Sequence, residues 1–170
     1  MKEIYFFKEQ VKETDEGTEI IISFLQNKYP NDTFTNVELE KEYQKKDIDY
    51  ICEHNAKIYG LEIKVDSYLT NNLFYEFFSN FELKTQGCFE KTEADFIAYY
   101  YSKRDILYII NPNELRKYVH RYQKWLTPKY VPNSTYESMG YIIPLSDLGK
   151  NIVLAKFENI SKNIDTYQKL

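Results

Sequence analysis

The chain has 170 residues, of which 43% are hydrophobic and 28% are charged, a balance that is typical of a globular protein and not of a disordered one. Its length predicts a single domain over residues 1–170. The formal net charge of −4 argues against a protein that coats nucleic acid through its overall charge.

The sequence has the features of a soluble, cytoplasmic protein. The N-terminus lacks the basic-then-apolar pattern of a signal peptide, and no apolar run approaches the roughly 20 residues of a membrane span, so we expect no membrane partner. The two cysteines, Cys52 and Cys88, predict free thiols in a reducing compartment. With two histidines and no CxxC pair, a zinc site is not expected.

The first clear element is an amphipathic helix that Thr14 or Asp15 caps and that ends before Pro30. Its apolar residues recur at helical spacing and predict one buried stripe. Residues 2–12 are expected as a short leading helix or arm. Glu19 flanks the apolar stripe, and taken by itself it is interpreted as a solvated acid that the helix dipole favours.

Residues 36–43 alternate in polarity and predict a strand that enters a hairpin. The hairpin strands are expected at about residues 46–53 and 58–66, with a tight turn centred on Asn55–Ala56. In that register, positions whose numbers sum to 111 face each other, so Asp49 stands opposite Glu62. Lys64 lies on the same face as Glu62, whereas Leu61, Ile63 and Val65 face the other way.

The later elements are less regular. A turn at residues 70–72 precedes a third strand over residues 73–78, which we place beside the hairpin, and two apolar runs at 94–101 and 105–110 predict strands. A helix is expected at 113–125, a loop at 127–137, a strand at 140–144, a helical turn at 146–148, and a strand or helix at 151–157. This order predicts an α/β (α+β) fold with a mixed sheet and helices packed on it.

Asp49 and Glu62 would destabilise each other if they faced each other without a cation. A divalent metal ion, with Lys64 beside it, is the candidate for that cation. Asp47 lies on the same face and can replace or join Asp49, and Glu76 on the third strand is a further possible acid. The alternative interpretation is an exposed strand face that carries ordinary charges.

The order of elements, together with Asp49 and, after twelve intervening residues, Glu62-Ile63-Lys64, resembles the PD-(D/E)XK nuclease superfamily. The resemblance implies a restriction-endonuclease-like fold, a central mixed β-sheet flanked by helices in the order αβββ(α)ββα. Phage-type and Holliday-junction-resolvase-like members are most similar, through segments like 72–79 and 87–95 here. The likeness covers residues 14–122 and leaves a C-terminal extension from about residue 127. No proline precedes Asp49, a departure from the motif.

The resemblance implies a metal-dependent DNA nuclease that hydrolyses phosphodiester bonds. Asp49, Glu62 and the carbonyl of Ile63 would hold Mg²⁺ or Mn²⁺, and hard cations of this kind prefer oxygen ligands. Glu19 matches an acid on the first helix that some members add to the metal site. Lys64 would orient the attacking water or stabilise charge on the phosphate.

The implied partner is duplex or branched DNA, and a resolvase-like activity would require a homodimer. Between residues 84 and 129, nine Lys and Arg stand against five Asp and Glu. The candidate phosphate contacts in this region are Lys91, Lys103, Arg104, Arg116, Lys117 and Arg121. Two alternatives stay open: an inactive nuclease-like module that acts on a protein partner or DNA, as in phage–host conflict, and an assembly protein of a mobile element.

Overall fold

The computed structural model describes the backbone of residues 2–133 and 135–162, and the side chains from residue 12 onward within those ranges. One sheet has six strands in the order β1 (Thr33–Asn36), β2 (Tyr50–His54), β3 (Lys57–Asp66), β6 (Phe96–Tyr101), β7 (Ile106–Ile110) and β10 (Val153–Glu158). It is mixed because β3 and β6 run parallel, whereas its other strand pairs are antiparallel. The predicted mixed α/β class is therefore confirmed.

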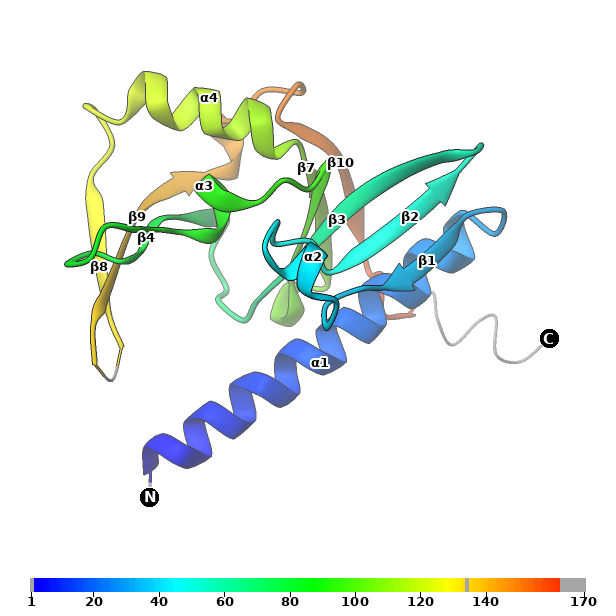
Figure 1. Ribbon diagram of the computed structural model, residues 1–170, viewed down its shortest axis with the longest axis horizontal. Helices are drawn as coiled ribbons and strands as arrows, with labels where there is room; N and C mark the ends of the chain where they lie inside the picture. Colours follow the sequence, from blue (N-terminus) through cyan, green and yellow to red (C-terminus); the bar gives the residue numbers. More distant parts are fainter. Residues whose placement is uncertain (1, 134, 163–170) are drawn as a thin grey trace.

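A second, antiparallel sheet has the strand order β5 (Thr85–Gln86), β4 (Asn72–Asn80), β9 (Glu137–Pro144) and β8 (Pro128–Pro132). The helices are α1 (Lys2–Lys28), α2 (Lys41–Gln44), α3 (Cys88–Lys91) and α4 (Pro112–Tyr122), with short 3₁₀ turns at Ser102–Arg104 and Leu145–Asp147. Figure 1 shows the second sheet beside the first, with α4 over their junction and α1 running diagonally across the molecule.

α1 is longer than predicted, because residues 2–12 are part of it and no cap interrupts the helix at Thr14 or Asp15. The helix ends before Pro30, as expected. Its apolar stripe packs on one face of the six-stranded sheet, where Ile21, Phe24 and Leu25 join Leu61 and other residues in a buried cluster.

The strand predicted at residues 36–43 is wrong. β1 ends at Asn36, and α2 begins at Lys41 within the predicted strand. The strand β2 starts at Tyr50, whereas the first hairpin strand was expected from about residue 46. The alternating pattern was misleading because its apolar members do not share a buried face: Val37 is 2% exposed, whereas Leu39 is 86% exposed.

The hairpin of β2 and β3 has the predicted register, from Tyr50 paired with Leu61 to His54 paired with Lys57. Asn55 and Ala56 both have positive φ angles, 49° and 60°, as a two-residue hairpin turn requires. Leu61 and Ile63 pack against α1. Glu62 and Lys64 alternate with these two residues along β3 and therefore point to the opposite face of the sheet.

The third strand, β4, does not lie beside the hairpin as predicted, since it pairs with β5 and β9 in the second sheet. The loop expected at residues 127–137 contains β8, whose prolines are its first and last residues and which lies at a sheet edge, where proline is tolerated. The segment expected as an extension supplies β8, β9 and β10. Residues 151–157 were expected as either a strand or a helix, and the structure has the strand β10 there.

The second sheet, α4 and the outer half of the first sheet enclose the larger core, which includes Tyr75, Tyr99, Tyr101, Leu115 and Tyr141. The six-stranded sheet thus lies between α1 on one face and α3, α4 and the second sheet on the other. Glu62 and Lys64 face this second side. Among the described residues, no helix is both long and apolar enough to cross a bilayer.

Candidate functional site

Asp49 lies just before β2, beside β3 and the residue that follows β1. Its backbone N–H donates to the carbonyl of Leu61 over 3.0 Å, and its own carbonyl accepts from the N–H of Val37 over 2.9 Å. Its carboxylate Oδ2 accepts from the backbone N–H of Ile63 over 2.8 Å. One carboxylate oxygen of Asp49 is therefore anchored on β3, between the two residues Glu62 and Lys64.

Glu62 is buried, with 3% of its surface exposed. Its Oε1 lies 2.6 Å from Lys64 Nζ. Its Oε2 is buried and accepts a hydrogen bond from none of the described residues. A buried carboxylate oxygen without a protein donor is costly, so this atom favours a proton, a cation or an ordered water beside it.

Burial raises the pKa of Glu62 to about 7, since the ion pair with Lys64 offsets only part of the desolvation and the charge of Asp49 acts in the same direction as burial. Near neutral pH, the protonated and ionised forms of Glu62 are therefore both populated. A divalent ion at Oε2 would favour the ionised form, because an opposite charge within a few ångströms stabilises it.

Burial lowers the pKa of Lys64, but the neighbouring Cys88, Glu62 and Asp49 outweigh that effect, so the pKa of Lys64 lies above its ordinary value. Burial raises the pKa of the Cys88 thiol to about 12, so Cys88 is neutral at physiological pH. The carboxylates of Glu62 and Asp49 are thus the groups that keep Lys64 charged.

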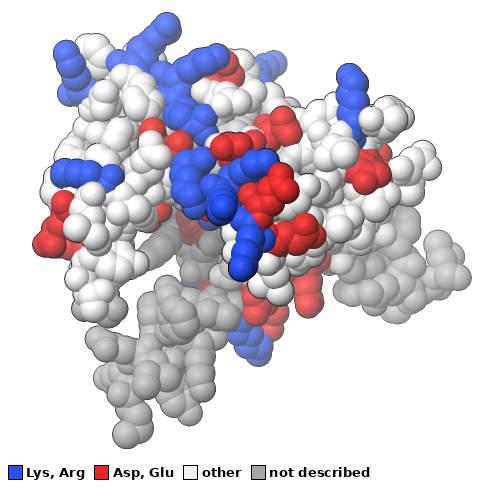
Figure 2. Space-filling view, in the orientation of Figure 1, with Lys and Arg blue, Asp and Glu red and all other residues white. Residues whose placement is uncertain are grey.

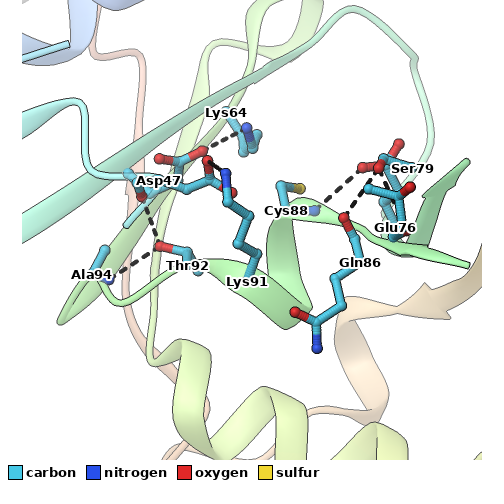
Figure 3. A network of polar contacts seen from close by, with 11 residues as sticks. Asp47, Lys64, Glu76, Ser79, Gln86, Cys88, Lys91, Thr92 and Ala94 are labelled. Atoms are coloured by element: carbon cyan, nitrogen blue, oxygen red, sulfur yellow. Dashed lines mark hydrogen bonds and ion pairs between the residues drawn. The ribbon is translucent and has the colours of Figure 1, made fainter. Parts of the chain in front are cut away.

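Asp47 and Glu76 are near this centre but have other partners. Asp47 has a positive φ angle of 47°, and its Oδ1 accepts from Lys91 Nζ over 2.6 Å. Glu76 Oε2 accepts from the backbone N–H of Cys88 over 3.3 Å. Figure 3 shows Cys88 between the Asp47–Lys91 pair and Glu76, with Lys64 on the same side as Asp47.

Glu19 does not join this group. It is exposed on α1, and α1 packs on the face of the sheet opposite Glu62. The acid of α1 that lines the same cavity as Lys64 is instead Glu13, whose Oε1 accepts from Ser102 Oγ over 2.9 Å. Sequence reasoning missed Glu13 because the helix was expected to begin only after it.

The six candidate phosphate contacts fall into two groups. Arg116 is occupied within the protein, since it donates to the carbonyls of Phe89 and Thr92 and to Asn113 Oδ1. Lys91 and Lys117 form ion pairs with Asp47 and Glu114, and Arg104 donates to the carbonyl of Thr70. Lys103 and Arg121 have exposed side chains.

Positive charge on this face is not continuous. Figure 2 shows Lys and Arg gathered over α4 and again at the centre of the face, over α2 and α3, where acids are interleaved with them. This mixed surface fits local contacts with a few phosphates better than broad coating of nucleic acid.

A cavity of about 770 Å³ lies between β3 and the second sheet, and Lys64 is one of the residues that line it. Its lining includes Glu13, Asp66, Phe74, Glu76, Cys88, Tyr99, Lys129, Val131 and Ile142. Lys64 and the aromatic side chains of Phe74 and Tyr99 therefore line the same cavity.

Within the described part of the chain, no cluster of three or more His, Cys, Asp or Glu side chains is arranged to hold a metal ion. A metal at this site would rest on the two carboxylates of Asp49 and Glu62, the Ile63 carbonyl and water. That donor set is all oxygen and suits Mg²⁺, which keeps several waters, and the partnerless Oε2 of Glu62 fits a cation.

Comparisons of the chain with models of protein families, with curated proteins and with solved structures found no match.

Proposed function

We propose that this protein is a metal-dependent DNA nuclease that hydrolyses phosphodiester bonds, with Asp49 and Glu62 binding Mg²⁺ or Mn²⁺ and Lys64 assisting the attack of water. The observation that carries the proposal is the buried oxygen of Glu62 that lacks a donor, next to an anchored aspartate and a charged lysine. Three groups of the required types meet at the start of one hairpin.

The arrangement of the strands supports a restriction-endonuclease-like fold. α1 covers one face of the sheet, the meander β1–β2–β3 carries Asp49 at the start of β2 and Glu62-Ile63-Lys64 within β3, and β6 lies parallel to β3. A mixed sheet with helices on its faces is what we would expect of the fold that the PD-(D/E)XK resemblance implies, and it supports the proposal.

Each residue has a defined task in this proposal. Asp49 and Glu62 would supply one carboxylate oxygen each to the metal, and the hydrogen bond from Ile63 N–H fixes the orientation of Asp49. The metal, when bound, would make a coordinated water more acidic and neutralise charge on the phosphate. Lys64 would hold the water or a phosphate oxygen through its ammonium group, which is charged and partly exposed.

Metal binding tests the proposal without any assumption about the DNA substrate. In calorimetric titration at pH 7.5, Mn²⁺ should bind wild-type protein, and the Asp49→Asn and Glu62→Gln variants should lose that binding. Asp47→Asn is the matched control, because Asp47 is already paired with Lys91, and it should bind Mn²⁺ as the wild type does. Equal Mn²⁺ binding by Glu62→Gln and wild type would contradict the proposal.

The alternative of an inactive nuclease-like module draws on one observation, the direct 2.6 Å pair between Lys64 and Glu62. If that pair substitutes for the metal, the site is a structural remnant and the protein acts by binding. A wild-type protein that neither binds Mn²⁺ nor cleaves DNA, yet holds a DNA or protein partner when Glu62 and Lys64 are both replaced, would favour this alternative.

A further inference from the structure

The cavity beside Lys64 has a lining that suits a flat aromatic ligand. Phe74, Tyr99, Val131 and Ile142 contribute ring and aliphatic surface to it. The ring of Phe74 lies directly against β9, since a Cβ at Gly140 would come within 2.8 Å of two of its atoms. Nucleobases stack on such aromatic surfaces irrespective of their sequence.

The size of the cavity limits what can enter. Its volume of about 770 Å³ falls within the range of roughly 300–1,000 Å³ that is usual for small-ligand sites. That volume is sufficient for a nucleotide but not for a segment of duplex. A DNA strand that reaches Lys64 can therefore place an unpaired base in the cavity, whereas a base in a duplex must first leave its pair and its stack.

The charges of the cavity favour a base over a phosphate in its interior. Asp66 accepts hydrogen bonds from the hydroxyl of Tyr99 over 2.8 Å and from the backbone N–H of Tyr68 over 2.7 Å. Glu13 and Glu76 also line it, and these carboxylates would repel a phosphate. Lys64 and the exposed Lys129 are the cations of the lining, and they suit the phosphates on either side of an inserted base.

We propose that this cavity receives an unpaired nucleobase of a DNA strand whose adjacent phosphate lies at Lys64. The choice of DNA rests on the proposed nuclease function, and the inference extends it by specifying single-stranded or branched DNA as the substrate. Carboxylate oxygens accept from the amino groups of cytosine, adenine and guanine, whereas thymine has no amino group. Strands rich in cytosine should therefore bind more tightly than strands of thymine.

Binding of fluorescently labelled oligonucleotides, measured by anisotropy in EDTA, tests this inference without cleavage. Wild-type protein should bind a twelve-residue deoxycytidine strand more tightly than the equivalent thymidine strand and more tightly than a duplex. Phe74→Ala should weaken the deoxycytidine complex by about 5-fold to 100-fold, the range expected for the loss of one stacked base. Tyr136→Ala, which removes an exposed aromatic outside the cavity lining, should leave it unchanged.

A second variant covers the case in which Phe74→Ala unfolds. Ile142→Trp adds bulk at a half-exposed position of the lining, so it should fill the cavity and weaken the single-strand complex while keeping duplex binding. Single-strand binding that neither substitution changes would overturn the inference. A free deoxycytidine monophosphate that binds as tightly as the strand would also overturn it, because the ligand would then be a nucleotide and not DNA.

The outcomes for the two proposals are distinguishable. Binding that depends on Phe74, without metal-dependent cleavage, would reject the nuclease and retain the base-binding cavity. Metal-dependent cleavage of duplex and single strands at equal rates, unaffected by Ile142→Trp, would retain the nuclease and reject the cavity as a base site.

Discussion

Lys64 Nζ lies 2.6 Å from one carboxylate oxygen of Glu62, whereas the other oxygen of the same group is buried without a donor among the described residues. The ion pair therefore satisfies half of a carboxylate and leaves the other half available. This asymmetry is what makes Glu62 a candidate metal ligand, because a cation can bind Oε2 while Lys64 keeps its place at Oε1.

The elevated pKa of Glu62 predicts a measurable dependence of stability on pH. Its pKa is about 7 in the folded protein, against about 4.3 in an unfolded chain. Between these values the folded state binds the extra proton, so the contribution of Glu62 to the free energy of unfolding falls as the pH rises. The full effect across this window is about 4 kcal/mol.

Urea unfolding in EDTA at pH 5 and pH 8 measures this effect. Glu62→Gln cannot ionise, so it should become more stable relative to wild type at pH 8 than at pH 5. Glu53→Gln is the control, since Glu53 is an exposed acid on the neighbouring strand, and its difference from wild type should not change with pH. Parallel pH profiles for wild type and Glu62→Gln would show that Glu62 titrates normally.

Replacing Lys64 should separate metal binding from chemistry. In Lys64→Ala the carboxylates of Asp49 and Glu62 remain, so Mn²⁺ should still bind, while the rate of DNA cleavage should fall about 100-fold to 1,000-fold, as for other groups that stabilise developing charge. Calorimetry and a cleavage time course provide the two readouts. Lys57→Ala, an exposed lysine at the hairpin turn, should affect neither. Loss of Mn²⁺ binding in Lys64→Ala would instead assign the lysine a role in holding the carboxylates.

Arg116 should act on stability and not on DNA binding. Its guanidinium donates to two carbonyls at the end of α3, so Arg116→Ala leaves buried acceptors unpaired and should lower the free energy of unfolding by about 2–3 kcal/mol. Arg116→Lys should not restore it, because an ammonium group lacks the planar fork. Lys117→Ala should change stability by less than about 0.5 kcal/mol. A stable Arg116→Ala variant with weakened DNA binding would contradict this assignment.

Gly17 sets the distance between α1 and β3. A Cβ at this position would come within 2.7 Å of Val65 Cγ2, so Gly17→Ala should destabilise the protein by about 1–3 kcal/mol through overpacking. Val65→Ala removes the clashing methyl groups, and the double variant should therefore cost less than the sum of the two single changes. Thermal unfolding of the four proteins gives the coupling. Additive costs would mean that α1 shifts freely over β3.

The hairpin and its chemical face could be predicted because their determinants are local. The two-residue turn fixes the register, and the alternation of Leu61 and Ile63 with Glu62 and Lys64 fixes which face is apolar. The shared face of Glu62 and Lys64 follows from these two facts alone. Asp49 lies just before β2, and its hydrogen bonds to Leu61 and Ile63 hold it beside them.

The second sheet could not be predicted because its pairings connect distant parts of the chain. β4 pairs with β9 across more than sixty positions, from Asn72 with Pro144 to Phe78 with Met139, and nothing in the aromatic run of β4 specifies this partner. The prolines of β8 suggested a loop, although an edge strand tolerates them. The cavity, whose walls come from both sheets, was therefore also outside what the sequence could indicate.

The most direct test of the central claim is cleavage of labelled single-stranded and branched DNA by wild type, Glu62→Gln and Lys64→Ala, in Mg²⁺, in Mn²⁺ and in EDTA. We predict cutting by wild type with either metal, none in EDTA, and at least a 100-fold loss in both variants. Metal-dependent cutting that survives both substitutions would contradict the account, because the activity would then arise from another site.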